Sequence, residues 1–267
     1  MSRKQAMYDK LISGNFSVEN RYFTFISRHK KLHGKFPVLS WGYASLLYIK
    51  YRIFHFPDRK FGQFTKSAEE TAEILCKADI ISFDIFDTLI FRRITPKQLF
   101  ENTGETLGIT DFADIRTDCE SKARKEKKEP CLNDIYRIAV KEERFTDKKA
   151  EEAMKAECVA EFSACYANPF MLEVYSKVIS SKKTVIITTD MYLTESVISK
   201  LLYDNGFRGF EKLFVSCEYG CGKADGKLYE IVKSEYGDKR IVHIGDNYMS
   251  DVLMAEKAGV EAVYYRK

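Results

Sequence analysis

The chain has 267 residues, of which 45% are hydrophobic and 31% are charged. This composition is typical of a folded globular protein and excludes an intrinsically disordered chain, and the length allows a well-buried core with one or two domains. The formal net charge of +4 conceals an asymmetry, because residues 1–70 carry 13 Lys+Arg against 5 Asp+Glu, whereas the remaining residues carry 30 against 34.

Residues 1–75 predict a basic N-terminal extension of several short helices. The extension is also rich in aromatic side chains, namely Tyr22, Phe23, Phe25, Phe36, Trp41, Tyr43, Tyr48, Tyr51, Phe54 and Phe56. Either these aromatics pack on the main domain, or residues 1–70 contact an anionic membrane surface or an acidic protein. The apolar window 36–56 contains too many charges for a membrane-spanning helix. Because the chain carries no nucleic-acid-binding motif, we expect no nucleic-acid partner.

The chain contains seven cysteines, an odd number, and its first forty residues lack the uninterrupted apolar core of a cleavable signal. We therefore expect reduced thiols and a cytoplasmic protein. Cys217 and Cys221 lack a second Cys/His pair at the spacing of a zinc site, so we do not predict zinc there.

The run from Ile80 to Phe83 predicts a buried parallel strand that ends in Asp84. In open α/β sheets ligands bind beyond the carboxyl ends of the strands, so Asp84 lies where chemistry is expected. A carboxylate there can attack an electrophilic centre such as phosphorus, provided that a cation offsets the charge repulsion. The alternative is that Asp84 or Asp87 only caps a turn or a helix.

After this strand the pattern is helical for about ninety residues, and no strand is predicted before Thr184. We interpret residues 95–167 as an all-helical cap inserted into a core made of residues 76–94 and 168–267. From Thr184 short apolar strands alternate with helices, which predicts a parallel sheet covered by helices on both faces. The predicted fold class is therefore α/β, with a Rossmann-like core, a helical cap and a helical N-terminal extension.

Three later positions carry polar residues directly after a strand or in a glycine-rich loop: Thr188-Thr189-Asp190, Lys223, and Gly245-Asp246-Asn247 followed by Asp251. Hydroxyls and amides after a strand can bind phosphate oxygens, and a lysine can offset negative charge. Carboxylates from two strand ends, Asp84 and Asp246, suit Mg²⁺. Each signal alone has a structural explanation, since Asp251 can be an ordinary first-turn acid. Their order along the chain favours one shared site.

Four motifs, F-D-I-F-D-T-L, T-T-D-M-Y-L, G-K-A-D-G-K-L-Y and H-I-G-D-N-Y-M-S-D, resemble those of the haloacid dehalogenase superfamily. The resemblance covers residues 78–267. The residues of these motifs are most similar to those of predicted hydrolases encoded near, or fused to, bacterial polysaccharide glycosyltransferases. The resemblance implies a Rossmann-like fold with a cap, and an activity that passes through an aspartyl-phosphate.

The resemblance also implies a role for each matching residue. Asp84 corresponds to the nucleophile, and Lys223 to the lysine that stabilises the nucleophile and the phosphoryl group. The implied phosphate-binding residues are Thr189, or Thr188 in a second register, with Asp190 and Asn247 beside them. The implied Mg²⁺ ligands are Asp84, the backbone carbonyl of Phe86, Asp246 and Asp251, of which the last holds the lysine or a metal-bound water.

One position departs from the phosphatases of the superfamily, which carry a general acid two residues after the nucleophile. That position is Phe86 here, and the next residue, Asp87, is the candidate replacement. An aromatic residue there also resembles the dehalogenases, which need no Mg²⁺, but the Asp246 motif favours phosphoryl chemistry. Arg92, Arg93, Met191 and Tyr192 follow the first two motifs and are the nearest candidates for substrate contacts outside the core.

We therefore expect a Mg²⁺-dependent phosphomonoesterase that acts on a small phosphorylated metabolite such as a sugar phosphate. The alternative is an accessory module with weak or no activity that docks to a glycosyltransferase or a membrane in polysaccharide synthesis. Phe86 and the basic extension favour this alternative, whereas the joint presence of Asp84, Thr189, Lys223 and Asp246 disfavours it.

Overall fold

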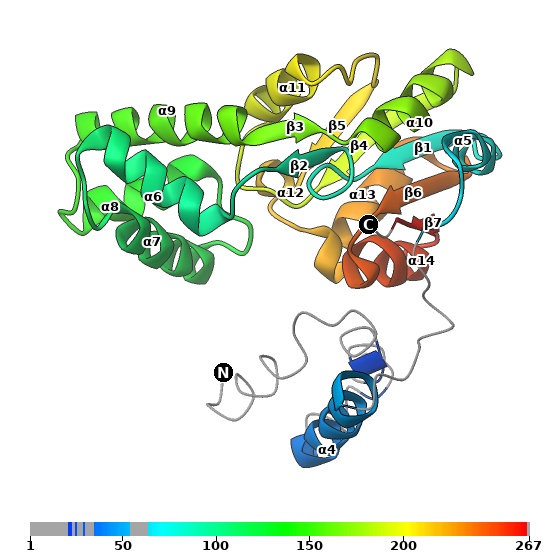
Figure 1. Ribbon diagram of the computed structural model, residues 1–267, viewed down its shortest axis with the longest axis horizontal. Coiled ribbons are helices and arrows are strands. Elements are labelled where there is room, and N and C mark those ends of the chain that lie inside the picture. The colour runs from blue at the N-terminus through cyan, green and yellow to red at the C-terminus, as the bar shows by residue number, and fades with distance from the viewer. Residues whose placement is uncertain (1–20, 23–24, 26–28, 30–34, 54–63, 266–267) are drawn as a thin grey trace. The chain divides into compact units, whose positions relative to one another are not determined.

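The computed structural model describes residues 21–22, 25, 29, 35–53 and 64–265 (Figure 1). They fall into two units, and the boundary lies between Thr65 and Lys66. Helix α5 (Ala68–Leu75) therefore belongs to the second unit, although the sequence analysis placed it in the extension 1–75. The physical reason is packing, because α5 buries its apolar side and its Glu69 pairs with Lys177 of α10 (Pro169–Ser180).

The elements with bounds in the described part of the first unit are helix α4 (Pro37–Tyr48) and the segment η1 (Ile49–Ile53), which continues it. Pro37 occupies the first turn of α4, where its missing N–H costs nothing. Phe23, Phe54 and Phe56 of the predicted basic extension, and most of its charges, lie outside the described residues. Among the helices that are described, none has the length and apolarity needed to cross a bilayer.

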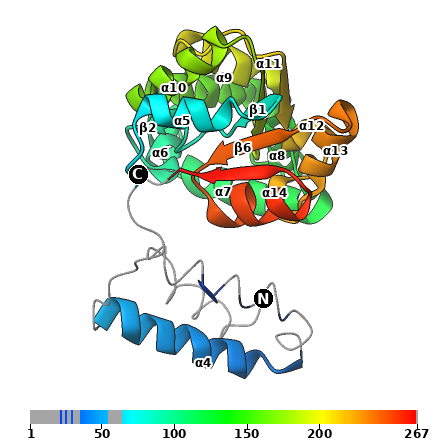
Figure 2. The same ribbon diagram turned by 90° about the vertical axis from the view of Figure 1, so that its right-hand side faces the viewer.

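The second unit is built on a sheet of five parallel strands in the order β5-β4-β1-β6-β7 (Figure 2). The strands are β1 (Ile80–Phe83), β4 (Thr184–Thr189), β5 (Lys212–Val215), β6 (Ile241–Gly245) and β7 (Glu261–Tyr264). Ile81 of β1 pairs with Val185 of β4 on one side and Val242 of β6 on the other, so β1 is central. The three inner strands, β1, β4 and β6, are almost entirely buried, whereas the edge strand β7 is partly exposed. This confirms the predicted Rossmann-like core.

Helices cover both faces of the sheet (Figures 1 and 2). On one face Phe83 of β1 contacts Tyr175 of α10, which in turn contacts Phe207. On the other face Ile80, Phe214 and Leu228 belong to one buried apolar cluster. The helical segments of this part are α11 (Glu195–Asp204), α12 (Ser216–Tyr219), η2 (Lys223–Asp225), α13 (Lys227–Tyr236), η3 (Tyr248–Leu253) and α14 (Met254–Lys257).

Four helices form a cap at one end of the second unit, beside the sheet (Figure 1). They are α6 (Pro96–Leu107), α7 (Phe112–Glu126), α8 (Leu132–Lys141) and α9 (Asp147–Ala164). Helix α6 begins after Thr95, and Thr95 and Gln98 satisfy each other's backbone N–H groups in a capping box. The side chain of Thr146 caps α9 by accepting from the N–H of Lys149, without a return bond from Lys149. Local capping thus sets where these two helices start.

Two short strands were not predicted, and this part of the sequence analysis was wrong. Strand β2 (Ile90–Arg92) pairs antiparallel with β3 (Cys165–Ala167), where the chain enters and leaves the cap. Each strand has only three residues, and the partners are more than seventy residues apart in sequence, so neither local alternation nor a turn signal was available. This pair of strands holds the two ends of the cap together next to the segment that follows Asp84.

Candidate active site

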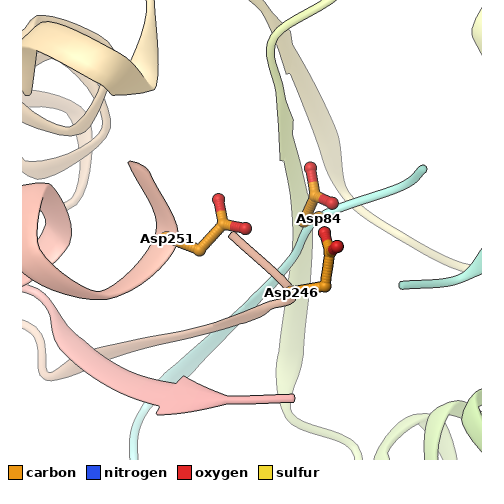
Figure 3. Close-up of side chains that lie close together, drawn as sticks. All are labelled: Asp84, Asp246 and Asp251. Atoms are coloured by element: carbon orange, nitrogen blue, oxygen red, sulfur yellow. The ribbon is translucent and has the colours of Figure 1, made fainter. Parts of the chain in front are cut away.

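Asp84 lies at the carboxyl end of the central strand β1, as the sequence predicted, and is 6% exposed (Figure 3). Its backbone N–H donates to the carbonyl of Ile244 in β6 (3.0 Å). Of its carboxylate oxygens, Oδ1 accepts from Nζ of Lys223 (2.5 Å) and Oδ2 from the hydroxyl of Thr88 (3.1 Å). The sequence analysis did not single out Thr88, although it lies four residues after Asp84 in the same motif. The side chain is therefore held in one orientation from both sides.

Lys223 is 3% exposed and forms ion pairs with two carboxylates, through Nζ to Asp84 and to Oδ1 of Asp251 (2.7 Å). Its backbone is also fixed, because the N–H groups of Lys223 and Ala224 donate to the Asp190 carboxylate (2.7 and 3.4 Å). Burial lowers the pKa of Lys223, but Asp251 and Asp84 outweigh it and hold the pKa well above its usual value. The lysine is therefore a permanent positive charge beside the candidate nucleophile.

Asp84, Asp246 and Asp251 come together in one acidic cluster, with one oxygen of each within 4.8 Å of the others (Figure 3). Asp246 follows β6, and Asp251 projects from η3. Burial, and then the charge of Asp251, raise the pKa of Asp84 to about 7 despite Lys223. Burial and the charge of Asp84 raise the pKa of Asp246 to about 8. One lysine does not compensate three carboxylates.

This cluster fits a divalent cation such as Mg²⁺. The donors are hard carboxylate oxygens, which this ion prefers. The carbonyl oxygen of Phe86 accepts no hydrogen bond from the described residues, so it is available as a further oxygen donor. Asp84, Asp246 and the Phe86 carbonyl are thus the ligands that the arrangement offers. Asp251 is the weaker candidate, because its Oδ1 accepts from Lys223 and its Oδ2 from the N–H of Asn247 (2.9 Å).

Asp251 sits where it does because residue 245 is a glycine. A Cβ at Gly245 would lie 2.3 Å from Oδ2 of Asp251, far inside van der Waals contact. Burial alone would raise the pKa of Asp251, but Lys223 and His243 hold the pKa below its usual range. Asp251 therefore remains an anion that anchors the lysine.

The two candidate threonines differ in their partners. The hydroxyl of Thr188 bonds to the hydroxyl of Ser82 (2.8 Å) inside the sheet. The hydroxyl of Thr189 has no hydrogen-bond partner within the described ranges, although the residue is only 1% exposed. Thr189 thus has a donor available for a phosphate oxygen. This favours the first of the two predicted registers.

The two other residues predicted to bind phosphate have structural partners. Oδ1 of Asn247 accepts from the N–H groups of Met249 and Ser250 (3.0 and 3.2 Å) and caps η3. The Asp190 carboxylate holds the Lys223 loop, as described above. Phosphate binding by either residue stays a prediction.

Phe86 and Asp87 follow the candidate nucleophile Asp84 in an unusual turn. Asp87 has a φ of 62°, and its N–H donates to the carbonyl of Ile90 (2.8 Å). Aspartate tolerates this left-handed conformation better than most residues do. Asp87 is exposed and close enough to Asp246 to contribute to its raised pKa. The ring of Phe86 can neither donate nor accept a proton, and the guanidinium of Arg92 stacks on it at 3.9 Å.

A line of buried polar side chains runs beneath the site and was missed by the sequence analysis. Ser82 of β1 bonds to Thr188 of β4 and to Nδ1 of His243 in β6 (2.7 Å). Nε2 of His243 then meets Oδ1 of Asp251 (3.3 Å). Burial lowers the pKa of His243. The available signal was a serine and a histidine inside strands that otherwise read as apolar.

The loop between α7 and α8 brings the cap onto the core. Lys128 pairs with Asp225, and the N–H of Leu132 donates to the carbonyl of Tyr192 (2.7 Å). Oε2 of Glu129 accepts from the hydroxyl of Ser216 (3.2 Å). Burial, and then the charge of Asp190, raise the pKa of Glu129. No sequence motif marked Glu129, because its contact with Ser216 depends on how the cap lies on the core.

The comparisons with known proteins agree with this fold. No family model matches the sequence, and no curated protein matches it. Among solved structures, a HAD-family enzyme from Bacteroides thetaiotaomicron is 15% identical with a TM-score of 0.52, over 70% of this chain and 93% of that one. A 2-haloacid dehalogenase from Pseudomonas syringae pv. tomato is 17% identical with a TM-score of 0.51, over 70% and 86%. The chain has the fold of the haloacid dehalogenase-like hydrolases.

Proposed function

We propose that the chain is a hydrolase of the haloacid dehalogenase superfamily and acts as a Mg²⁺-dependent phosphomonoesterase. The observation that carries the proposal is the charge of the site, where Asp84 and Asp246 lie together with one buried lysine. A carboxylate that attacks a neutral carbon–halogen bond needs no second carboxylate beside it. A carboxylate that attacks a phosphate ester needs one, because the reaction uses a cation and this cation must be held by anionic oxygens.

The residues have separate tasks in this reaction. The Asp84 carboxylate attacks phosphorus, the bond to the alcohol oxygen breaks, and an aspartyl-phosphate forms. Lys223 offsets charge on the nucleophile and the phosphoryl oxygens, and the unpartnered hydroxyl of Thr189 donates to one of those oxygens. Mg²⁺, held by Asp84, Asp246 and the Phe86 carbonyl, would supply further charge neutralisation when bound. Water then attacks phosphorus, which releases phosphate and regenerates Asp84.

Proton transfer to the leaving alcohol is the step for which the site is least equipped. Phe86 carries no proton, so we propose that Asp87 supplies it. Its position near Asp246 supports this proposal, because that places its carboxylate beside the acidic cluster. A small phosphorylated metabolite such as a sugar phosphate remains the proposed substrate.

A second candidate is a weakly catalytic or non-catalytic accessory module in polysaccharide synthesis, docked to a glycosyltransferase or a membrane. Phe86 favours it, because general acid catalysis contributes about 10²–10⁴-fold to such reactions. The two candidates predict different rates with good leaving groups. A phosphatase with poor proton transfer still hydrolyses p-nitrophenyl phosphate, whereas a non-catalytic module does not.

The test is an assay of the full-length chain on p-nitrophenyl phosphate and on 2-chloropropionate, each with Mg²⁺ and with EDTA. We expect phosphate release that requires Mg²⁺ and no halide release. Phosphate release that is unchanged in EDTA would contradict the metal site. Halide release in EDTA would instead identify a dehalogenase, and no release from either compound would favour the accessory module.

A further inference from the structure

Two arginines lie where the cap meets the core, and they differ in how many of their nitrogens are bound. Arg116 is 1% exposed and donates through all three nitrogens, to Glu157 (2.8 and 2.9 Å) and Glu120 (2.9 Å). Arg92 donates only through Nε, to Oε1 of Glu161 (2.6 Å). Its two Nη groups have no hydrogen-bond partner among the residues that the structure describes. Arg92 therefore offers an open pair of N–H donors.

The guanidinium of Arg92 is held in place. It stacks on the ring of Phe86 at 3.9 Å, and its partner Glu161 is 2% exposed. Oε1 of Glu161 also accepts from the thiol of Cys165 (3.2 Å), which is the residue that Arg92 faces across the β2–β3 pair. A guanidinium fixed in this way loses little conformational entropy when it binds a ligand.

Phe86 connects this arginine to the candidate nucleophile, because the ring on which Arg92 stacks belongs to the residue two positions after Asp84. An aspartate at position 86 would sit against the guanidinium and neutralise it. The phenyl ring instead holds Arg92 by a cation–π contact, so that Glu161 is its only anionic partner among the described residues and its two Nη groups are left for another anion. The loss of the usual acid thus makes a cationic donor available at the same place.

Tyr192 adds a second unpartnered polar group to this region. It lies two residues after Asp190, and its ring is 4.7 Å from Cζ of Arg116. Its hydroxyl has no hydrogen-bond partner in the described part of the chain. Burial raises the pKa of Tyr192 well above its usual value, so the hydroxyl stays a neutral donor. Tyr192 is also among the groups that raise the pKa of Arg92, so the two side chains belong to the same region.

The other two candidates from the sequence are less suited. Arg93 is exposed, and it donates to the carbonyl of Ser163 (3.3 Å) and lies over Tyr166, with no contact to Phe86. The side chain of Met191 has no N–H or O–H donor. Arg92 and Tyr192 are therefore the pair that we consider.

We propose that Arg92, assisted by the hydroxyl of Tyr192, binds a second anionic group, a carboxylate or a phosphate, on the alcohol part of the ester that Asp84 attacks. Two parallel N–H donors of one guanidinium match two oxygens of such a group. The inference rests on the proposed phosphatase function and names its substrate class, an ester that carries one more negative charge beyond the scissile phosphate.

The test uses three esters of one secondary alcohol skeleton: isopropyl phosphate, phospholactate and propylene glycol bisphosphate. They differ only in one substituent of the carbon that carries the scissile phosphate, which is a methyl group, a carboxylate or a phosphorylated hydroxymethyl group. Binding to the Asp84→Asn variant is measured by calorimetry with Mg²⁺ present, so that the answer does not depend on turnover. We expect one of the two anionic esters to bind about 10- to 100-fold more tightly than isopropyl phosphate. The tighter of them identifies the carboxylate or the phosphate.

Arg92→Gln in the Asp84→Asn background should abolish that preference and leave the affinity for isopropyl phosphate within a few fold. Arg92→Lys, which keeps a charge beside Glu161 but loses the paired donors, should retain part of it. Arg137→Gln is the matched control, because Arg137 also pairs with a cap glutamate, Glu126, on the surface. Equal binding of all three esters, or a preference that survives Arg92→Gln, would overturn the inference. Failure of the phosphatase assay on wild-type protein would contradict the proposed function separately.

Discussion

The core and the cap each bury a cluster of charges, but only the cap balances them. In the cap, Arg116 donates to Glu157 through two nitrogens and to Glu120 through a third. Burial lowers the pKa of Arg116, but Glu157 outweighs it and raises the pKa above its usual value. In the core, Lys223 faces three carboxylates, and the pKa values of Asp84 and Asp246 rise to about 7 and 8.

The difference separates a structural role from a functional one. A buried ion pair whose partners satisfy each other stabilises one packing arrangement and needs nothing from outside. A cluster with excess negative charge is costly until a cation arrives, so it is maintained only where that cation is used. Incomplete compensation thus favours the core cluster over the equally buried cap cluster as the reactive site of the proposed function.

The largest expected effect is on turnover. Asp84→Asn removes the attacking oxygen with almost no change of shape, so we expect the phosphatase rate to fall by about 10⁵-fold or more. The fold should survive, because the change also relieves repulsion within the acidic cluster. Steady-state assays and circular dichroism measure the two properties. A variant that keeps most of its rate would rule out Asp84 as the nucleophile.

Asp87→Asn tests whether this neighbour of the core cluster transfers protons. We expect the rate on alkyl phosphates to fall by about 10²–10⁴-fold, while aryl phosphates, whose leaving groups need no proton, change little. Both rates are compared with those of the wild type under the same conditions. Equal losses on both substrate types, accompanied by lower stability, would mean that Asp87 only shapes its turn.

Substitutions in the cap cluster should lower the stability of the protein and leave the reaction rate unchanged. Glu157→Gln leaves the guanidinium of Arg116 without its bidentate partner in a buried site, so the free energy of unfolding should fall by about 3 kcal/mol or more. Denaturant unfolding measures this. Glu120→Gln is the control, since Glu120 is 23% exposed and its pair should be worth at most about 1 kcal/mol. Similar losses of stability in the two variants would mean that the buried Arg116–Glu157 pair matters no more than the partly exposed Arg116–Glu120 pair.

Magnesium should stabilise the protein through the core cluster only. At about 100 times its dissociation constant, Mg²⁺ should raise the free energy of unfolding by about 2.7 kcal/mol. Asp246→Asn should remove most of this gain, and Glu157→Gln should keep it. Thermal unfolding with Mg²⁺ and with EDTA gives the comparison. A gain that is unchanged in Asp246→Asn would place the metal elsewhere.

The last expected effect is the pH dependence of the metal-free protein. The carboxyls of Asp84 and Asp246 have pKa values raised from 3.8 to about 7 and about 8 in the folded state, so the folded state binds their protons more tightly than the unfolded chain does. Their contribution to stability is fully present below pH 3.8 and is lost as the pH rises through about 7 and 8. In EDTA, wild type should therefore lose stability relative to Asp246→Asn over this range. A difference that grows in the opposite direction would contradict the raised pKa values.

Much of the fold was predictable because its signals are local. The order of helices and parallel strands in the second unit follows from apolar runs and caps such as Thr95 and Asn168, and the structure confirms the Rossmann-like core. Strands β2 and β3 were not predicted, because three residues are too few to show the alternation of a strand. The boundary near residue 75 depended on how α5 packs against α10, which the sequence does not show.

The candidate site was predictable only where a residue ends a strand or belongs to a motif. Asp84 and Asp246 met both conditions and Lys223 met the second, and the structure brings them together. Glu129 reaches the core from the cap, so its position depends on how the cap lies on the core. Arg92 was a candidate because it follows the first motif, but its contacts with Phe86 and Glu161 also depend on the position of the cap. Ser82 and His243 looked like interruptions of apolar strands. Their hydrogen bonds become visible only once three strands lie side by side.

The buried line of Ser82, Thr188 and His243 has a consequence for how the chain finds its fold. These residues lie on β1, β4 and β6, which are separated in sequence by the whole cap and by two further βα units. If one strand paired one residue out of step, its polar side chain would turn to the opposite face and be buried without a partner. Each such group costs about 1–3 kcal/mol. The line therefore penalises misaligned sheets and selects one strand alignment before any substrate is bound.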